Sequence, residues 1–300
     1  MKRRHADRVF MLLTAMAVAL IVAMLAIILS NIVRHGWERL TWEFLTAAPR
    51  VGMTEGGIFP AIFGTLLLVL LMTVCVVPLG VCVAIYFSEY ANRHSWLYRW
   101  ARQAVNNLAG VPSIVFGLFG LGFFVRFVGG GIDKAFFGGA LTYGQPALIW
   151  AALTMAVLTL PVMIVSVEEA LQAVPQSYRD ASYALGATRS QTVFRVVLPH
   201  ALSGVLTGGI LAVSRGAGEV APILFVGAAY FLPHLPARLN DQFMELGYHV
   251  FILSTQSPDV EATTPILYST VLVLLALTFL LNLAAIAIRA RLRAALESMR

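Results

Sequence analysis

Charged side chains are scarce in this sequence. Only 12% of its 300 residues are Asp, Glu, Lys or Arg, whereas 59% are apolar, and the mean hydropathy is +0.81. A soluble domain is usually about a quarter charged, so a globule of this composition could not cover its surface with solvated groups. The composition therefore excludes a disordered chain, a secreted disulfide scaffold and a nucleic-acid-binding protein, and it predicts an integral membrane protein.

Cysteine is almost absent as well. Cys75 and Cys82 share one apolar stretch, with no CxxC spacing and no neighbouring pair of histidines. Isolated thiols in such a stretch are typical of buried packing residues. The sequence also has no GxxxxGK[ST] phosphate loop, no HExxH and no nucleophile elbow. We therefore expect no metal site, no cofactor and no catalytic residue in this chain.

The sequence contains several long apolar runs. A membrane-spanning helix needs about 20 apolar residues, and six runs reach that length: about 9–33, 58–87, 108–128, 146–167, 202–230 and 265–288. They predict an all-α fold of six transmembrane helices. The first run is too long for a signal peptide and has no evident cleavage site, so we expect a retained anchor. The expected division is an anchor with the first outer loop (1–57), a transmembrane domain (58–289) and a tail (290–300).

Basic residues are concentrated on alternate sides of these runs. One side has Lys2, Arg3, Arg4, Arg8, Arg93, Arg99, Arg102, Arg179, Arg189, Arg195, Arg289, Arg291, Arg293 and Arg300. The other side has Arg34, Arg39, Arg50, Lys134 and Arg238. Because cytoplasmic loops are enriched in Lys and Arg, the first side and both termini should be cytoplasmic. The net charge of +6 then reflects topology and requires no nucleic acid.

The cytoplasmic loop at 174–199 has the most informative pattern. Pro175 suits the start of a short helix, Gly186 permits a turn at its end, and we expect Pro199 to end a second short helix. The loop resembles the EAA loop of ABC-importer permeases, whose pattern is E-A-A-x-x-x-G, nine residues, then I-x-L-P. The matching residues are Asp180, Ala181, Ser182, Gly186, Val196, Leu198 and Pro199. Asp180, Ser182 and Val196 depart mildly from that pattern.

This resemblance implies that the loop docks into a groove of an ATP-hydrolysing partner, which binds ATP in place of this chain. The implied coupling residues are Asp180, Ala181, Ser182, Gly186, Leu198 and Pro199. Arg179 or Asp180 would make polar contacts with that partner. The alternative interpretation is an ordinary amphipathic loop between two helices. Elsewhere on this side, the spacing of Glu89 and Arg93 suggests an i,i+4 ion pair.

The fifth apolar run contains two ionisable residues, Arg215 and Glu219. Charges at membrane depth cost about 2.5–3.5 kcal/mol or more each and usually indicate function. Four residues apart, the two would share one helix face, beside a stripe of small residues that permits close helix approach: Gly204, Gly208, Ala212 and Gly216. We interpret this face as an anion path, since arginine suits phosphate. The alternative is a neutral pair that only fixes helix packing.

Three further segments narrow the resemblance to the permease subunits of phosphate ABC importers: V-P-S-I-V-x-G at 111–117, R-x-x-G-E-x-A-P at 215–222 and N-D-Q-F at 240–243. The resemblance covers about residues 58–289. The residues assigned to the translocation path are Ser113, Ser214, Arg215 and Glu219. For Pro112 and Ser113, an equally weighted alternative is that they only interrupt the start of the helix and do not line the path.

The resemblance also implies partners. These are a PstC-like permease in a heterodimer, a PstB-like ATPase dimer, a periplasmic or lipid-anchored phosphate-binding protein, phosphate and the lipid of the inner (plasma) membrane, with no nucleic acid. Two other classes remain open. A permease for another solute, such as molybdate or sulfate, would keep the coupling loop, whereas a self-powered channel or secondary transporter would have no use for it.

Overall fold

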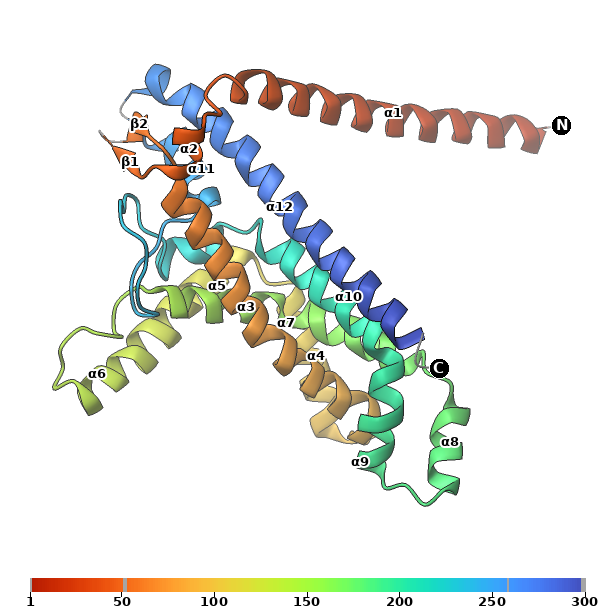
Figure 1. The fold of residues 1–300 in the computed structure, drawn as a ribbon. Coiled ribbons are helices and arrows are strands. Elements are labelled where there is room, and N and C mark those ends of the chain that lie inside the picture. Colours follow the sequence, from red (N-terminus) through yellow and green to blue (C-terminus); the bar gives the residue numbers. More distant parts are fainter. Residues whose placement is uncertain (1, 51–52, 258, 298–300) are drawn as a thin grey trace.

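The computed structural model of the chain describes residues 2–50, 53–257 and 259–297. Arg300, one of the cations assigned above to the cytoplasmic side, lies outside the described residues. Within them, six helical segments are long and apolar enough to cross a membrane, which confirms the expected all-α membrane fold (Figure 1). Their bounds are Phe10–Gly36, Phe59–Tyr90, Ser113–Phe136, Leu148–Gln172, Arg189–Gly216 and Val260–Ala294.

Several of these segments are composite. The first span lies in α1 (Lys2–Gly36) and the last in α12 (Val260–Glu297). The second is α3 (Phe59–Ile85) followed by the π-helical turn η2 (Tyr86–Tyr90). The third joins α5 (Ser113–Phe119), the π-helical η3 (Gly120–Gly129) and α6 (Gly130–Phe136), and the fourth is α7 (Leu148–Gln172). The fifth joins α9 (Arg189–Thr192), the π-helical η4 (Val193–Val197) and α10 (Leu198–Gly216).

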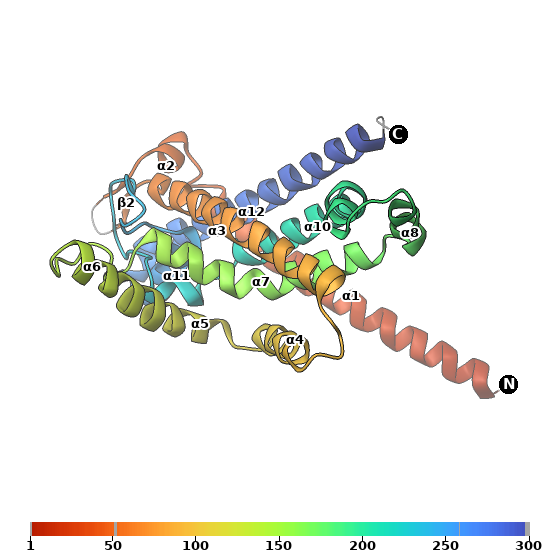
Figure 2. The ribbon, with the colours of Figure 1, turned by 90° about the horizontal axis from the view of Figure 1, so that it is seen from below.

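Helix α7 is the centre of the bundle. Two thirds of its most apolar window is buried, and it packs most extensively against α3 and α10 (Figure 2). Its Met155 and Met163 are fully buried, as is Met72 of α3. The small-residue stripe of α10 makes this packing close, because a Cβ added to Gly204 would lie 2.2 Å from the Cβ of Ala170. The stripe therefore brings α10 against α7, as expected.

The fifth helix ends earlier than the sequence suggested. We expected it to run to about Tyr230, but α10 ends at Gly216, and a 3₁₀ turn, η5 (Ala221–Phe225), follows after a break. Glycines at 216 and 218 favour this break because they weaken a helix interior. Pro222 completes it, because proline cannot donate to the preceding turn.

The second helix of the coupling loop does not end at Pro199, contrary to our expectation. Pro199 lies in the first turn of α10, and the helical segment runs without interruption from Arg189 to Gly216. The π-helical turn η4 directly precedes α10. It changes the hydrogen-bond register at the point where the nitrogen of Pro199 has no proton to donate. The coupling loop is thus continuous with a membrane-spanning helix.

The sequence interpretation missed two shorter helices. The amphipathic α4 (Trp96–Ala109) lies between the second and third spans, and α11 (Leu246–Thr255) precedes α12. Trp96 and Trp100 of α4 are largely exposed, whereas its opposite side packs on α7. Near α11 lie α2 (Trp42–Thr46) and a two-stranded antiparallel hairpin, β1 (Pro49–Arg50) and β2 (Glu55–Gly56), in which Pro49 pairs with Gly56.

Within the described residues, helix α1 contacts the bundle only near its C-terminal end. Its apolar window is 0% buried in the chain, and it runs away from the other helices in both views (Figures 1 and 2). The contact is close at Gly36, where an added Cβ would lie 2.7 Å from the carbonyl oxygen of Tyr268. The hydroxyl of Ser269 also donates to the carbonyl of Gly36 at 2.8 Å. The first and last helices of the chain therefore meet at this point.

Candidate functional site

Arg215 and Glu219 face each other across the break after α10. The Arg215 Nε atom lies 3.9 Å from Glu219 Oε1, and their side chains are 36% and 26% exposed. The two residues were expected on one helix face, which is wrong: Glu219 lies beyond the helix, in a turn where its N–H donates to the carbonyl of Gly216. An ion pair of this length leaves the guanidinium free to donate to another anion.

Ser214 points to a neighbouring helix. Its hydroxyl has two acceptors for its one proton, the carbonyl oxygen of Ile210 at 2.8 Å and the side-chain oxygen of Asn282 in α12. The sequence interpretation missed Asn282, although an amide in the middle of an apolar run is a visible signal. Arg289, further along α12, donates to the hydroxyl of Thr207 at 2.9 Å. Polar contacts thus join α10 to α12 at two levels.

Ser113 occupies the first position of α5 and is half-buried. Helix α5 packs against η5, and a Cβ added to Gly117 would lie 2.8 Å from the carbonyl oxygen of Pro222. Among the described residues, no hydrogen bond joins Ser113 to Arg215. The structure therefore groups Ser214, Arg215 and Glu219 at one break, with the helix of Ser113 beside the turn that follows it.

A mainly apolar cavity of about 330 Å³ opens between α4, α7 and α10. Its lining includes Asn106 of α4, Ser166 of α7 and Leu211 of α10. Leu211 precedes Arg215 by four residues, which places it one helical turn away on the same side of α10. The cavity shows that α4, which the sequence interpretation missed, borders open space next to the helix of the candidate path.

The coupling loop folds into two short helices around a glycine turn, as expected. We call this unit, residues 176–192, the knob: α8 (Gln176–Ala184), the turn, and α9 (Figure 1). Gly186 has φ +81°, a conformation that glycine adopts without strain. Thr188 and Gln191 form a capping box at the start of α9. The hydroxyls of Ser182 and Thr192 lie 2.9 Å apart and join the two arms.

The other residues assigned to coupling fall into two groups. Asp180, Ala181 and Gly186 are exposed on the knob, where a partner could reach them. Leu198 and Pro199 are half-buried at the start of α10 and belong to the membrane helix. Leu185, which the sequence interpretation missed, is 90% exposed at the tip of the knob. Its side chain is therefore accessible to a partner that docks on the knob.

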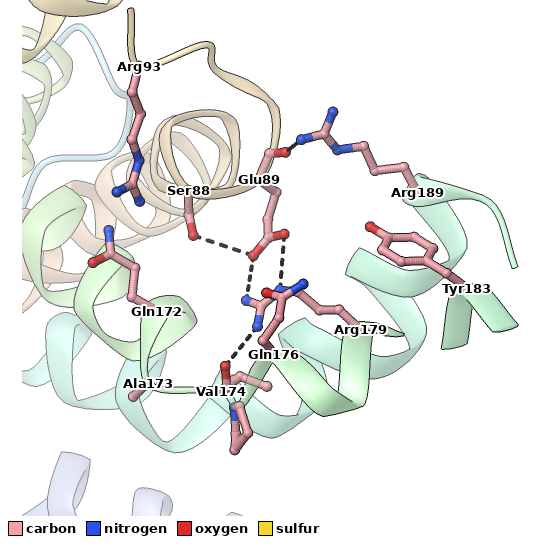
Figure 3. Close-up of a pocket in the computed structure, with 11 residues that line it drawn as sticks. Ser88, Glu89, Arg93, Gln172, Ala173, Val174, Gln176, Arg179, Tyr183 and Arg189 are labelled. Carbon is pink, nitrogen blue, oxygen red and sulfur yellow. Dashed lines mark hydrogen bonds and ion pairs between the residues drawn. The ribbon is translucent and has the colours of Figure 1, made fainter. Parts of the chain in front are cut away.

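Arg179 is buried within the chain, so of the two residues expected to make polar contacts with a partner only Asp180 is exposed. Its Nη2 atom donates to Glu89 Oε1 at 2.7 Å and its Nε to Glu89 Oε2 at 3.4 Å, and both side chains are less than a tenth exposed (Figure 3). The guanidinium also donates to the carbonyls of Val174 at 2.7 Å and Leu171 at 2.9 Å. This arginine thus binds four acceptors at once.

Glu89 was expected to pair with Arg93 and does not. Its helix ends at Tyr90, so Arg93 is not on the next helical turn, and Figure 3 shows its side chain turned away from the Glu89 carboxylate. A second arginine reaches the same place from α9: Arg189 donates to the backbone carbonyl of Glu89 and lies over the ring of Tyr90, 5.0 Å from its centroid. These groups line a polar pocket of about 520 Å³.

Comparison with known proteins gives consistent matches. The family model described as "Binding-protein-dependent transport system inner membrane component" matches residues 76–296. The chain is 32% identical over 276 residues to the "Probable ABC transporter permease protein YqgI" of Bacillus subtilis (strain 168), covering 87% of this chain and 88% of that protein. It is 31% identical over 255 residues to the "Probable phosphate transport system permease protein PstA" of Methanocaldococcus jannaschii, covering 85% and 84%.

The fold is also found among solved structures. The crystal structure of a bacterial ABC transporter involved in the import of the acidic polysaccharide alginate matches with a TM-score of 0.65, covering 93% of this chain and 95% of that chain. The sequence identity is 15%, so this likeness concerns the fold alone. The helical arrangement of most of this chain is therefore shared with a chain of that transporter.

Proposed function

The chain belongs to the family of binding-protein-dependent transport system inner membrane components, and from this premise we propose that it is one permease subunit of an ATP-driven phosphate importer. It is a multi-pass protein of the plasma membrane. As a permease it is a transport component, and a partner ATPase hydrolyses ATP. The assignment of phosphate as the substrate rests on the similarity of this chain to a phosphate transport permease over most of both chains.

Arg215 is the residue in the proposed path that best suits phosphate. Moving a divalent anion through a low-dielectric region requires a compensating cation, and a guanidinium can donate two parallel hydrogen bonds to phosphate oxygens. The 3.9 Å separation from Glu219 makes the resident ion pair weak enough to exchange. Glu219 holds the guanidinium while the path is empty and competes with the anion when it must leave. Ser214 and Ser113 add hydroxyl groups along the same path.

The rest of the transporter follows from the same proposal. The other half of the path comes from a PstC-like sister permease, the knob docks on a PstB-like ATPase, and a binding protein delivers phosphate from outside. Both termini and the knob are cytoplasmic in this arrangement, which agrees with the distribution of basic residues. ATP-driven closure of the ATPases moves the two knobs together, and the path opens to the outside.

Transport by the reconstituted complex tests the proposal. Vesicles containing this chain, its sister permease and the ATPase, with binding protein outside and ATP inside, should accumulate labelled phosphate. Arg215→Ala should reduce the rate by about tenfold or more, and Arg215→Lys by less, because it keeps the charge and loses the paired donors. Arg34→Ala, at the exposed end of α1, is the matched control.

Three results would contradict the proposal. Normal phosphate uptake by Arg215→Ala would remove the role of this residue. Uptake of sulfate or molybdate in preference to phosphate would replace the substrate and keep the transporter class. Uptake by this chain without an ATPase partner would remove the ABC assignment altogether.

A further inference from the structure

We propose that Glu89 and Arg179 form a buried latch that fastens the knob to the end of α3, so that a movement of the knob also moves α3. The inference rests on the proposed function, because it concerns how work done by an ATPase reaches the membrane helices. Glu89 and Arg179 are positioning residues in this role. Neither needs to touch the solute or the ATPase.

Connectivity alone does not link the knob to α3. In sequence the knob follows α7 and precedes α10, and Glu89 lies 90 residues before Arg179. A force on the knob would therefore reach α7 and α10 through the backbone. It can reach α3 directly through side chains, and the ion pair between Arg179 and Glu89 of η2, the turn that follows α3, is such a contact (Figure 3).

The latch is built to stay closed. A guanidinium that donates to both oxygens of one carboxylate and to two carbonyls cannot rotate without losing several hydrogen bonds at once. Glu89 is 7% exposed and Arg179 8%, so water screens the pair poorly. Separating buried charges from each other leaves each one unpaired, which is strongly unfavourable. The pair therefore behaves as a rigid link.

The second arm of the knob is attached at the same place. Arg189 of α9 donates to the backbone carbonyl of Glu89 and stacks on Tyr90. Ser182 and Thr192 join the arms to each other. Both arms are thus bound to η2, the turn that ends α3, and the knob with this turn forms one body. Since α3 packs along α7, the three helices attached to this body would move together.

A broken latch should uncouple the transporter without disabling either half. The measurement is the number of ATP molecules hydrolysed per phosphate transported, in vesicles with the complete complex and the binding protein. Glu89→Gln and Arg179→Gln should each raise this ratio by about threefold to tenfold, while the complex still assembles and hydrolyses ATP. The double variant should raise it no further than the larger single effect, because both substitutions break one contact.

Two matched variants control for the loss of one charge near the same surface. Glu169→Gln removes an exposed carboxylate at the end of α7, and Arg99→Gln removes an exposed guanidinium from α4. Both should keep the wild-type ratio. If a single variant fails to assemble because a buried charge is unpaired, the double variant, which leaves no charge in the latch, still provides the test.

The outcomes separate the latch from the proposed function. A wild-type complex without phosphate uptake contradicts the proposed function, whereas wild-type uptake together with a normal ratio in the double variant overturns the latch. Additive effects of the two substitutions would also overturn it, because they would show that Glu89 and Arg179 act on different contacts. A raised ratio with non-additive single and double effects supports it.

Discussion

Arg102 of α4 forms an ion pair with Glu168 of α7, and the Glu168 side chain is only 5% exposed. The side chain of Gln172 donates to the other oxygen of the same carboxylate at 3.0 Å. The pair attaches an amphipathic helix that the sequence interpretation missed to the most buried helix of the bundle. It also holds α4 beside the cavity that Leu211 lines.

Removing this arginine should loosen the bundle. Arg102→Met leaves the buried Glu168 carboxylate without its cation, and we expect the free energy of unfolding to fall by about 2–4 kcal/mol. Thermal unfolding of the purified protein in detergent measures the change. Arg99→Met, on the exposed side of the same helix, should leave the melting temperature unchanged, and equal melting of the two variants would refute the structural role of the pair.

The packing of α10 on α7 should depend on Gly204. A methyl group there would lie 2.2 Å from the Cβ of Ala170, so Gly204→Ala must push two helices apart. Overpacking of this kind typically costs about 1–3 kcal/mol. The same substitution at Gly122, where an added Cβ has no neighbour within 4 Å, is the matched control. A Gly204→Ala protein that is as heat-stable as the control would contradict this account of the stripe.

Leu185 should contribute to docking on the ATPase. Its side chain is 90% exposed at the tip of the knob, and burial of a leucine on a partner is worth about 1.5–3 kcal/mol. Leu185→Ser should therefore weaken association with the ATPase by about tenfold or more, as measured by retention of the ATPase on the immobilised permease. Leu141→Ser, at an exposed leucine in the connection before α7, is the control. Unchanged retention of the ATPase by Leu185→Ser would exclude this role.

His249 should make the fold sensitive to acid. Burial lowers the pKa of His249 to about 4, below the usual 6.5, and its Nδ1 atom has no hydrogen-bond partner among the residues that the structure describes. Between these pH values the unfolded chain binds a proton that the folded chain does not. The contribution of His249 to the free energy of unfolding is therefore fully present above about pH 6.5. The free energy of unfolding falls by up to about 3 kcal/mol as the pH approaches 4.

Melting curves between pH 7 and pH 4 measure this loss. His249→Gln, which cannot titrate, should lose less stability than the wild type over the same interval, whereas His234→Gln, at an exposed position, should behave like the wild type. Parallel curves for the wild type and His249→Gln would show that another group controls the acid response.

Much of the architecture could be predicted because the bilayer imposes a simple length rule on apolar runs. All six spans were found in this way, and the glycine turn of the knob followed from Gly186. The end of α10 could not be found by the same rule, because residues 217–230 are nearly as apolar as the helix itself. The glycines at 216 and 218 and Pro222 mark the break instead, and the break moves Glu219 off the helix of Arg215.

The residues that form ion pairs with each other were the part of the structure that the sequence predicted least well. Glu89 had a basic neighbour four residues away in Arg93, yet it pairs with Arg179, 90 residues away. Local spacing predicts a pair only while the helix continues, and η2 ends at Tyr90. Helix α4 was overlooked for a related reason: its apolar residues occupy one side only, so its average composition resembles that of a loop.

The position of α1 has a consequence for biosynthesis. Its described apolar side chains are largely exposed, and within the described part of the chain it contacts other helices only near Gly36. It can therefore enter the bilayer as an independent helix while the spans that follow are still being translated. The residues that contact it, Tyr268 and Ser269, belong to α12, which is synthesised after the other five described spans. The contact between α1 and α12 therefore forms only after the four described spans between them have been synthesised.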